Sequence, residues 1–375
     1  MQRKLFHKNQ IIASGSLSAL AWRKFRRDRL GFISLLCIAL LTLMAILGYL
    51  ITPDATPFAN EQHLELGVKH PGFKVQMLQT CLKTTDSDVN FFEMMLFGKK
   101  NTYRRIPISN YYYIGDRIIA NEYTGIIGEI GKEIILNKSE IASDRPIVTQ
   151  RFWLGTDRYG RDILSMLIIG TRVSLAVGLI SVLISLLIGI TIGSLGGFFR
   201  GWVDEVIVWL INVVWSIPTL LLVIAITFAL GRGFWQVFVA VGLTMWVEVA
   251  RITRVQILSI REKEYVEATK ALGFSNFRTI YRHILPNVMS PVIVISAGNF
   301  ASAILIEAGL SFLGIGVQPP MPSWGSMIRD NYSYIILDSA YLAILPGLAI
   351  MLLVLAFMLV GNSLRDALDV KIVSG

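Results

Sequence analysis

The chain contains little charge for its size. Only 16% of its 375 residues are Asp, Glu, Lys or Arg, whereas a soluble globular protein carries about 25%. Hydrophobic residues make up 54% of the chain, and the mean hydropathy is +0.58. This composition excludes an ordinary soluble protein and predicts a membrane protein. The formal net charge of +9 then indicates cationic loops, because cytoplasmic loops of membrane proteins are rich in Lys and Arg.

Cysteine and histidine are also scarce. Of the two cysteines, Cys37 lies inside an apolar run and Cys81 in a polar segment, which argues against a disulfide between them. The four histidines are scattered and show no metal-ligand spacing. They are His7, His63, His70 and His283. The sequence therefore predicts no metal site.

Motifs of known catalytic sites are absent as well. The chain has no complete Walker sequence, no metalloprotease His-Glu-x-x-His and no nucleophile elbow. Gly155 and Gly160 have the spacing that begins a phosphate loop, but Arg161 and Asp162 stand where Lys and Ser or Thr are required. We therefore expect a non-catalytic protein without a cofactor of its own.

Six apolar runs dominate the chain and predict an all-α polytopic membrane protein. Most are as long as the roughly 20 residues that cross a bilayer core of about 30 Å. They cover residues 30–53, 173–199, 206–231, 233–247, 288–306 and 339–364. Pro218 predicts a kink in the third run, and residues 248–250 extend the short fourth run. Gly189, Gly193 and Gly197 form a smooth face that lets a second helix approach closely, either in this chain or in a partner.

Polar segments divide the chain into domains. Residues 1–29 are basic and predict a cytoplasmic amphipathic segment, followed by the first transmembrane helix at 30–53. Residues 54–150 contain strand-favouring runs of Tyr and Ile and predict a small strand-rich extracytoplasmic subdomain, with an unstructured loop as the alternative. Residues 151–375 form the core with five further spans. Basic residues before the first span and in 248–287 predict that both termini are cytoplasmic.

Residues 264–287 predict two short amphipathic helices joined by a glycine turn. Gly273 can end a helix in the left-handed conformation, and Ser275 can cap the next one. Pro286 is predicted to end the second helix. Apolar side chains recur at the spacing of one helix face, with Tyr265, Ala268, Thr269 and Leu272 on the first helix and Phe277, Ile280, Tyr281 and Ile284 on the second.

Three interpretations of this helix pair compete. It could be a packed loop, a DNA-binding helix-turn-helix with Arg278 and Arg282 on one face, or a docking site for another protein. Long apolar spans bracket the pair and keep it from reaching a duplex, so nucleic acid is not an expected partner. What remains is a docking pair on the cytoplasmic surface, between two membrane helices.

This pair also resembles a known family motif. Glu267, Ala268 and Thr269, followed by Gly273, resemble the EAA loop of permease subunits in binding-protein-dependent ATP-binding-cassette importers. The chain departs from that pattern in having Thr269 for the second Ala and an Ile directly before Leu-Pro. In that family the loop, here 251–287, is a coupling helix that inserts into a groove on a separate ATPase subunit. The resemblance implies that the ATPase-coupling residues are Glu264, Glu267, Ala268, Thr269, Gly273, Arg278, Leu285 and Pro286.

Residues 153–162 resemble the signature that precedes the second span in the dipeptide, oligopeptide and nickel branch of these permeases, on the extracytoplasmic side. Its signature residues are Trp153, Gly155, Asp157, Gly160 and Asp162. We interpret their role as structural, because the two aspartates can pair with Arg158, Arg161 or Arg172 to hold the start of the helix.

Residues 307–325 resemble an irregular stretch on the outer side of the same branch, near the translocation path. The resemblance assigns Glu307, Ser311, Gln318 and Trp324 to that path or to an outer gate. Glu307 lies near the end of a span, where an ionisable residue is a functional candidate. It is either an interfacial carboxylate paired with a neighbour or a contact to the solute.

Taken together, these resemblances imply the six-helix architecture of a type I importer permease, in its second or C-type subunit. The implied partners are a homologous permease in a heterodimer, two ATPase subunits that hold ATP and Mg, and an extracytoplasmic solute-binding protein. The implied location is the lipid bilayer of a bacterial inner membrane, and the implied solutes are di- or oligopeptides.

Three alternatives remain open at this point. The same architecture could move nickel chelates or another small solute. An ion-driven secondary transporter is the second alternative, although such proteins usually carry mid-membrane ionisable residues and inverted repeats that are not evident here. The third is a membrane-anchored receptor whose outer segment binds a ligand.

Overall fold

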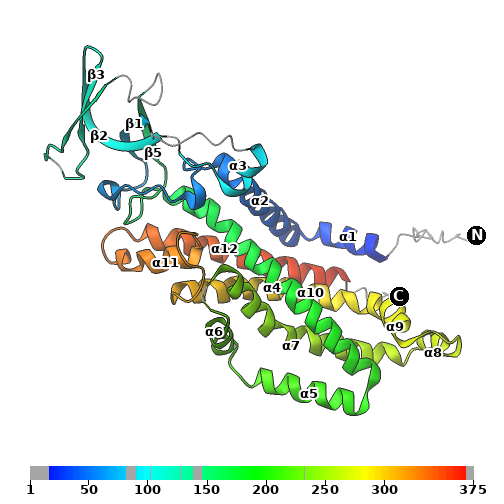
Figure 1. The fold of residues 1–375 in the computed structure, drawn as a ribbon. Coiled ribbons are helices and arrows are strands. Elements are labelled where there is room, and N and C mark those ends of the chain that lie inside the picture. The colour runs from blue at the N-terminus through cyan, green and yellow to red at the C-terminus, as the bar shows by residue number, and fades with distance from the viewer. Residues whose placement is uncertain are drawn as a thin grey trace, which may run out of the picture.

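The protein consists of a helical bundle with a small β-sheet at one end (Figure 1). This computed structural model describes residues 17–81, 90–101, 103–126, 128–137, 146–231 and 233–368. The helices are α1 Leu17–Arg27, α2 Arg29–Ile51, α3 Phe91–Phe97, α4 Ile163–Phe199, α5 Gly201–Trp215, α6 Thr219–Leu230, α7 Phe234–Arg261, α8 Glu264–Ala271, α9 Asn276–Thr279, α10 Leu285–Phe312, α11 Trp324–Asn331 and α12 Tyr341–Leu368. The expected polytopic all-α fold is confirmed.

Within the described residues, five helices are long and apolar enough to cross a membrane: α2, α4, α7, α10 and α12. A sixth span exists if α5 and α6 are counted together, although these two helices are bent by 92°. The kink predicted at Pro218 is therefore a sharp break. Pro218 immediately precedes α6 and has no N–H to donate to the preceding turn, so α5 ends before it.

The glycine face of α4 packs against α7 within this chain. A Cβ atom at Gly193 would lie 2.4 Å from the carbonyl oxygen of Ala250, and one at Gly189 would lie 2.7 Å from that of Trp246. The two backbones can approach this closely only because the glycines lack side chains. The sequence left open whether this face meets the same chain or a partner, and the structure assigns it to the same chain.

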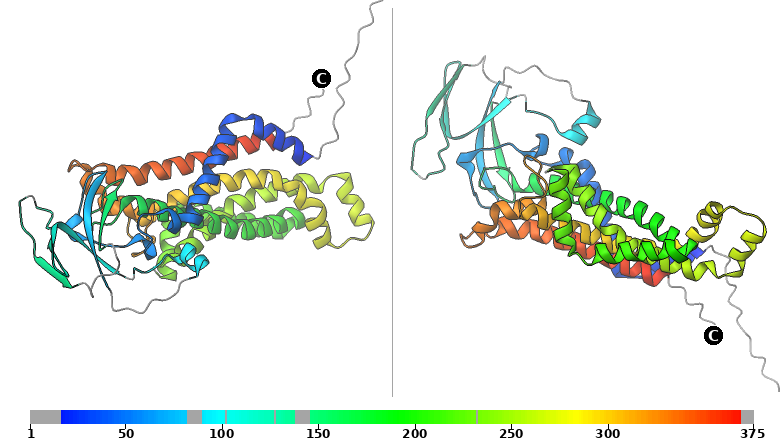
Figure 2. Two further views of the ribbon diagram at one scale, coloured as in Figure 1. Left: turned by 90° about the horizontal axis from the view of Figure 1, so that it is seen from above. Right: turned by 60° about the horizontal axis from the view of Figure 1, so that its bottom comes forward.

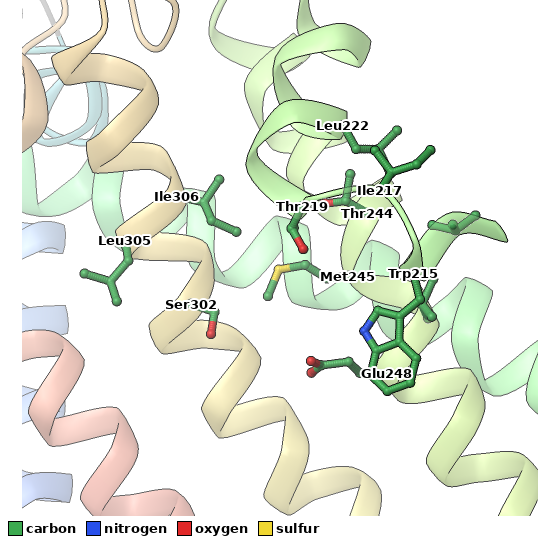
Figure 3. Close-up of a pocket in the computed structure, with 12 residues that line it drawn as sticks. Trp215, Ile217, Thr219, Leu222, Thr244, Met245, Glu248, Ser302, Leu305 and Ile306 are labelled. Atoms are coloured by element: carbon green, nitrogen blue, oxygen red, sulfur yellow. The ribbon is translucent and has the colours of Figure 1, made fainter. Parts of the chain in front are cut away.

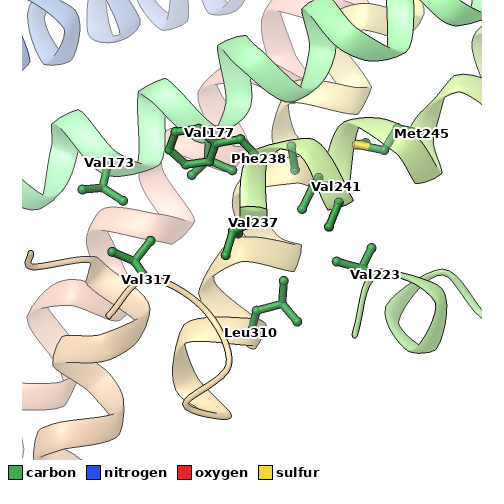
Figure 4. Close-up of a cluster of buried hydrophobic side chains, with 11 residues drawn as sticks. Val173, Val177, Val223, Val237, Phe238, Val241, Met245, Leu310 and Val317 are labelled. Atoms are coloured by element: carbon green, nitrogen blue, oxygen red, sulfur yellow. The ribbon is translucent and has the colours of Figure 1, made fainter. Parts of the chain in front are cut away.

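Apolar side chains from α4, α6, α7 and α10 form the core of the bundle toward the sheet end (Figure 4). Val177 of α4, Phe238 and Val241 of α7 and Leu310 of α10 are all fully buried there. Burying side chains of this size removes their apolar surface from solvent and holds these helices together. The same helices therefore form one packed unit.

The sheet has five antiparallel strands in the order β4-β3-β2-β1-β5. They are β1 Phe73–Cys81, β2 Tyr103–Ile114, β3 Arg117–Glu122, β4 Glu133–Asn137 and β5 Ile147–Phe152. Leu78, Ile108, Ile118 and Ala120 fill one side of the sheet. The strand-rich subdomain is confirmed, with β1 and β5 added outside the Tyr- and Ile-rich runs that predicted it.

Helix α1 packs against the end of α12. Phe25 is buried in a cluster with Val360 and Ala367, and Trp22 of the same helix is exposed. Both α1 and the end of α12 lie at the end of the bundle that carries α8 and α9, opposite the sheet (Figures 1 and 2). The first 16 residues of the predicted N-terminal segment lie outside the described residues.

Candidate functional site

The helix pair predicted at 264–287 is present as α8 and α9, and Gly273 forms the turn between them. Its φ is 75°, a conformation that side chains with a Cβ disfavour. Nothing lies within 4 Å of the place where a Cβ would be, so the requirement for glycine here is conformational. Ser275 caps α9, since its Oγ accepts a hydrogen bond from the Arg278 amide at 3.4 Å.

The inner side of the pair is held by two threonines and an asparagine. Thr269 of α8 and Thr279 of α9 are buried, and their Oγ1 atoms lie 3.3 Å apart. The Asn287 side-chain amide donates to the Tyr265 hydroxyl at 3.3 Å, which connects α8 to α10. Thr269, which departs from the family pattern, thus forms the contact between the two helices.

The outer side of the pair is apolar and uncovered. Tyr265 is 45% exposed, Leu272 72%, Phe277 77% and Tyr281 68%, and the rings of the last two stack with centroids 5.9 Å apart. The predicted spacing grouped these four with Thr269 and Ile284, which are buried, so each predicted face is divided between the two sides of the pair. The fully buried residue of α8 is Val266, which that spacing left out. Exposed apolar side chains on a protruding element are typical of an interaction site.

Most of the predicted coupling residues lie around this surface. Thr269 is the buried member of the set and Leu285 is half-buried. The exposed members are Glu264, Glu267, Ala268, Gly273, Arg278 and Pro286. The structure thus brings the set together on one protruding element, with charged residues beside apolar ones.

The pair is anchored in the membrane bundle. Val266 of α8 and Ile284, which precedes α10, are fully buried in a cluster with Phe198 of α4, Ile257 of α7 and Val288 of α10. Close packing transmits displacement, because a packed interior yields little to compression. A force on α8 is therefore passed to the three spans that meet here.

The prediction that Pro286 ends the second helix is wrong. α9, a π-helical turn at Ile280–Ile284 and α10 form one helical segment from Asn276 to Phe312. Pro286 stands in the first turn of α10, where the wider π-helical turn accommodates the missing N–H. α9 is therefore continuous with a spanning helix.

Residues 153–162 join the sheet to α4. Asp157 is fully buried and bonded to Arg161, with 2.7 Å between its Oδ2 and the arginine Nε, so that predicted pairing is confirmed. Gly160 has a positive φ of 73°, and a Cβ there would lie 1.7 Å from the His63 carbonyl oxygen. Gly155 likewise has a φ of 80°, whereas Trp153 is exposed and stacks with a neighbouring arginine.

The other predicted pairings in this region are wrong. Asp162 caps α4 by accepting a hydrogen bond from the Ser165 amide at 2.9 Å, and burial raises the pKa of its carboxyl group. Arg172 donates to backbone carbonyl oxygens of α2 and α3. Arg158 lies 3.7 Å from Asp330. A helix start with free N–H groups attracts a carboxylate as strongly as an arginine does.

The stretch at 307–325 comprises the end of α10, a partly exposed connecting turn and the start of α11. Glu307 is fully buried and accepts a hydrogen bond from the Ser311 hydroxyl at 2.6 Å. The Ser311 Oγ in turn accepts from the Val317 amide at 3.1 Å. Gln318 donates to the Gly316 carbonyl at 2.8 Å. These residues hold the chain where it leaves the helix.

Trp324 begins α11 and fixes it to α4, because its indole N–H donates to the Leu167 carbonyl at 3.0 Å. A role of Glu307, Ser311, Gln318 or Trp324 in a path or gate stays a prediction, since the structure shows contacts within the chain, with Gln318 half-buried and the other three buried.

A cavity of about 350 Å³ lies where α5 and α6 bend apart, facing α7 and α10 (Figure 3). Its polar groups include Thr219 and Glu248, whose carboxylate points into the cavity near Ser302 (Figure 3). Among the described residues, no ion pair or hydrogen bond involves the Glu248 side chain. The guanidinium of Arg251, one turn further along α7, lies 4.4 Å from the Trp215 ring centroid.

Sequence reasoning did not assign this cavity. The break at Pro218 was its only local signal, and a kink alone does not show which helices face the gap. α7 connects the cavity to the coupling pair, because Glu248 lines the cavity while the next residue, Val249, belongs to the cluster beneath α8.

Comparison with known proteins identifies similar sequences for most of the chain. The sequence profile of the "Binding-protein-dependent transport system inner membrane component" family matches residues 185–374. The profile "N-terminal TM domain of oligopeptide transport permease C" matches residues 16–65.

Two curated relatives and one solved structure show the extent of similarity. A glutathione transport system permease protein, GsiD, from Pectobacterium atrosepticum is 42% identical over 222 residues, covering 59% of this chain and 73% of that protein. A di/tripeptide transport system permease protein, DppC, from Pseudomonas aeruginosa is 44% identical over 223 residues, with the same coverage. An inward-facing MetNI methionine ABC transporter structure aligns with a TM-score of 0.46 at 18% identity, covering 55% of this chain and 97% of that one.

Proposed function

The chain belongs to the family of binding-protein-dependent transport system inner membrane components, and from this membership we propose that it imports peptides as one permease subunit of an ATP-driven complex. As a member of that family it is a multi-pass membrane permease. The observation that carries the proposal is the uncovered apolar surface of α8 and α9, which is anchored in the same helices that line the cavity.

In the proposed mechanism, two ATPase subunits bind ATP and Mg, and one of them receives α8 in a groove. The exposed rings of Phe277 and Tyr281 supply apolar contact, and Glu267 supplies a polar contact at the rim. When the ATPases close, α8 is displaced, and Val266 passes the displacement to α7 and α10. Because α7 and α10 also line the cavity, its access changes from one side of the membrane to the other.

The remaining assignments complete this proposal. This chain has no catalytic step and no cofactor of its own, and ATP hydrolysis occurs on the partner chains. A homologous permease closes the translocation path opposite the α5–α6 bend. The coupling pair and both termini face the cytoplasm of a bacterial cell, which agrees with Arg23, Lys24, Arg26 and Arg27 at the same end of the bundle. The sheet then faces outward, toward a solute-binding protein.

Peptides are the proposed solutes because the named relatives transport glutathione and di- or tripeptides. Membership in a binding-protein-dependent family also argues against the ion-driven alternative. Nickel chelates remain an alternative cargo of the same architecture. Uptake of labelled dipeptides and of a nickel chelate by the reconstituted complex, each in competition with the other, decides between these cargoes.

The coupling assignment is tested by removing apolar contact or reversing charge on the exposed surface. Phe277→Ser and Glu267→Arg should lower both ATPase co-purification and ATP-dependent uptake while leaving membrane insertion intact. Tyr113→Ser is the matched control, because Tyr113 is 60% exposed on β2 at the other end of the molecule. Wild-type uptake by both coupling variants would show that α8 and α9 do not dock the ATPase.

A further inference from the structure

Helix α3 is largely apolar, and none of its side chains is buried. Six of its seven residues are Phe, Met or Leu, and Glu93 is the exception. Phe91 is 60% exposed, Phe92 71%, Leu96 52% and Phe97 68%. Exposed apolar side chains in this number are stable mainly inside a protein core or a membrane, so the surface of α3 requires a cover that the described part of the chain does not provide.

Arg172 of α4 fixes the position of α3 along the bundle. Its guanidinium donates to the Ile46 carbonyl of α2 at 2.8 Å and to the carbonyls of Met95 and Leu96 of α3 at 2.6 and 2.7 Å. It also lies 4.7 Å from the ring centroid of Tyr49. The carboxyl end of α3 is therefore level with residue 46 of α2.

Residue 46 of α2 lies inside the membrane-spanning part of that helix. α2 has 23 residues, which at about 1.5 Å per residue is close to the roughly 30 Å of a bilayer core. Five residues separate Ile46 from the end of α2 at Ile51, so α3 reaches about 8 Å below that end. Figure 1 shows α3 beside the end of α2 that is farther from α1.

The neighbouring groups agree with a bilayer boundary. Beside α3, α2 exposes Leu40, Leu43 and Ile46 on one face, as a lipid-facing helix does. Lys99 and Lys100 follow α3 directly and are exposed. Aromatic residues flanked by lysines are typical of helices that lie in the membrane interface.

We propose that α3 is an interfacial anchor whose Phe side chains insert into the lipid leaflet on the sheet's side of the membrane, with Lys99 and Lys100 at the phosphate level. Its partner is phospholipid. The Arg172 contacts hold the anchor in place. Gly98 and Lys99 connect α3 back to the segment after α2, where the Lys99 amide donates a hydrogen bond to the Ala55 carbonyl at 2.9 Å. Through this connection the anchor sets the height of the sheet above the membrane.

The test is spin-label accessibility in the complete transporter, reconstituted in phosphatidylethanolamine and phosphatidylglycerol vesicles. Cys37 and Cys81 are first replaced by Ala, and a single label is placed at Phe92→Cys or, as a second position, at Phe91→Cys. Leu40→Cys on α2 supplies the lipid reference. Ile130→Cys, at a site 81% exposed beside the sheet, supplies the water reference.

At both α3 positions we expect the label to collide more often with oxygen than with a water-soluble nickel chelate. The ratio of these two collision rates should be close to the value measured at Leu40 and far from the value measured at Ile130. A ratio equal to that at Ile130 would show that α3 lies in water and would overturn the proposal. An immobilised label that neither reagent reaches would show that a protein partner, such as a second permease, covers α3, and would also overturn it. The experiment does not depend on the transported solute.

Discussion

Glu248 and Val249 are consecutive residues of α7 that serve opposite surfaces. The Glu248 carboxylate points into the cavity beside the α5–α6 bend, whereas Val249 is fully buried in the cluster that supports α8. A helix turns by about 100° per residue, so neighbouring side chains can face two sites at once. A small rotation of α7 would therefore change both the packing of the cluster beneath α8 and the shape of the cavity.

Truncating Val249 should weaken this connection. Val249→Ala removes two methyl groups from a fully buried position that contacts Gly189 of α4, at a cost of about 1–3 kcal/mol in the free energy of unfolding. We expect a lower melting temperature of the purified complex and more ATP hydrolysed per solute imported. Val255→Ala is the control, since Val255 is 51% exposed on the same helix. Equal effects of the two substitutions would contradict the role of the cluster.

Because Thr269 and Thr279 are in contact, substitutions of the two residues should have non-additive effects. Thr269→Ala leaves the buried hydroxyl of Thr279 without this partner, which costs about 1 kcal/mol. The double variant should be little worse than Thr269→Ala alone, because that substitution already removes the contact between the two hydroxyls, together with the hydrogen bond from Thr269 to the Val266 carbonyl. The measurement is the ratio of uptake to ATP hydrolysis. Strictly additive losses would show that the two hydroxyls act independently, and Thr191→Ala, at an exposed position of α4, is the control.

The effect of a substitution at Gly273 on transport should depend on how well the new residue tolerates a positive φ. Alanine at a φ of 75° costs about 1–2 kcal/mol, so Gly273→Ala should reduce the uptake per ATP moderately. Gly273→Pro should abolish coupling, because the proline ring holds φ near −65°. Membrane insertion should be normal in both variants. Gly298→Ala in α10, where a Cβ also meets nothing within 4 Å, is the matched control and should transport normally.

The link between the sheet and the bundle should depend on pH. Glu61, in the segment after α2, accepts a hydrogen bond from Arg105 of β2 at 3.2 Å. Burial opposes its ionisation, but the His63 ring, whose Nε2 lies 3.6 Å from the carboxylate, and the charge of Arg105 outweigh burial, so the pKa of Glu61 lies below its usual value of 4.5. The folded state therefore favours the carboxylate.

The stabilisation from Glu61 is complete above pH 4.5, the usual pKa, and is lost as the pH falls through the lower pKa of the folded state. We expect the melting temperature of the wild type to exceed that of Glu61→Gln at neutral pH, and the difference to shrink on acidification. Glu129→Gln, at an exposed position beside the sheet, should show no such pH-dependent difference. A constant difference between the wild type and Glu61→Gln would contradict the assignment.

The helical periodicity around Gly273 predicted both coupling helices and their turn, because helix-forming spacing, a glycine and a capping serine are local signals. It did not predict that Val266 is the fully buried residue of α8. Spacing shows that apolar residues share a face, but whether that face meets the same chain or a partner depends on neighbours that are distant in sequence. The same reason explains the wrong end at Pro286, where a π-helical turn permits the helix to continue.

The sequence by itself determined that this protein is a helical membrane protein with a strand-rich segment and two short amphipathic helices joined by a glycine turn, since span length, turn residues and helical spacing are properties of short segments. Only the tertiary structure decided that the α4 glycines pack against α7, that α5 and α6 open a cavity, and that Arg172 holds an exposed α3 beside α2. Each of these is a contact between segments far apart in the chain, and such contacts depend on how whole helices pack.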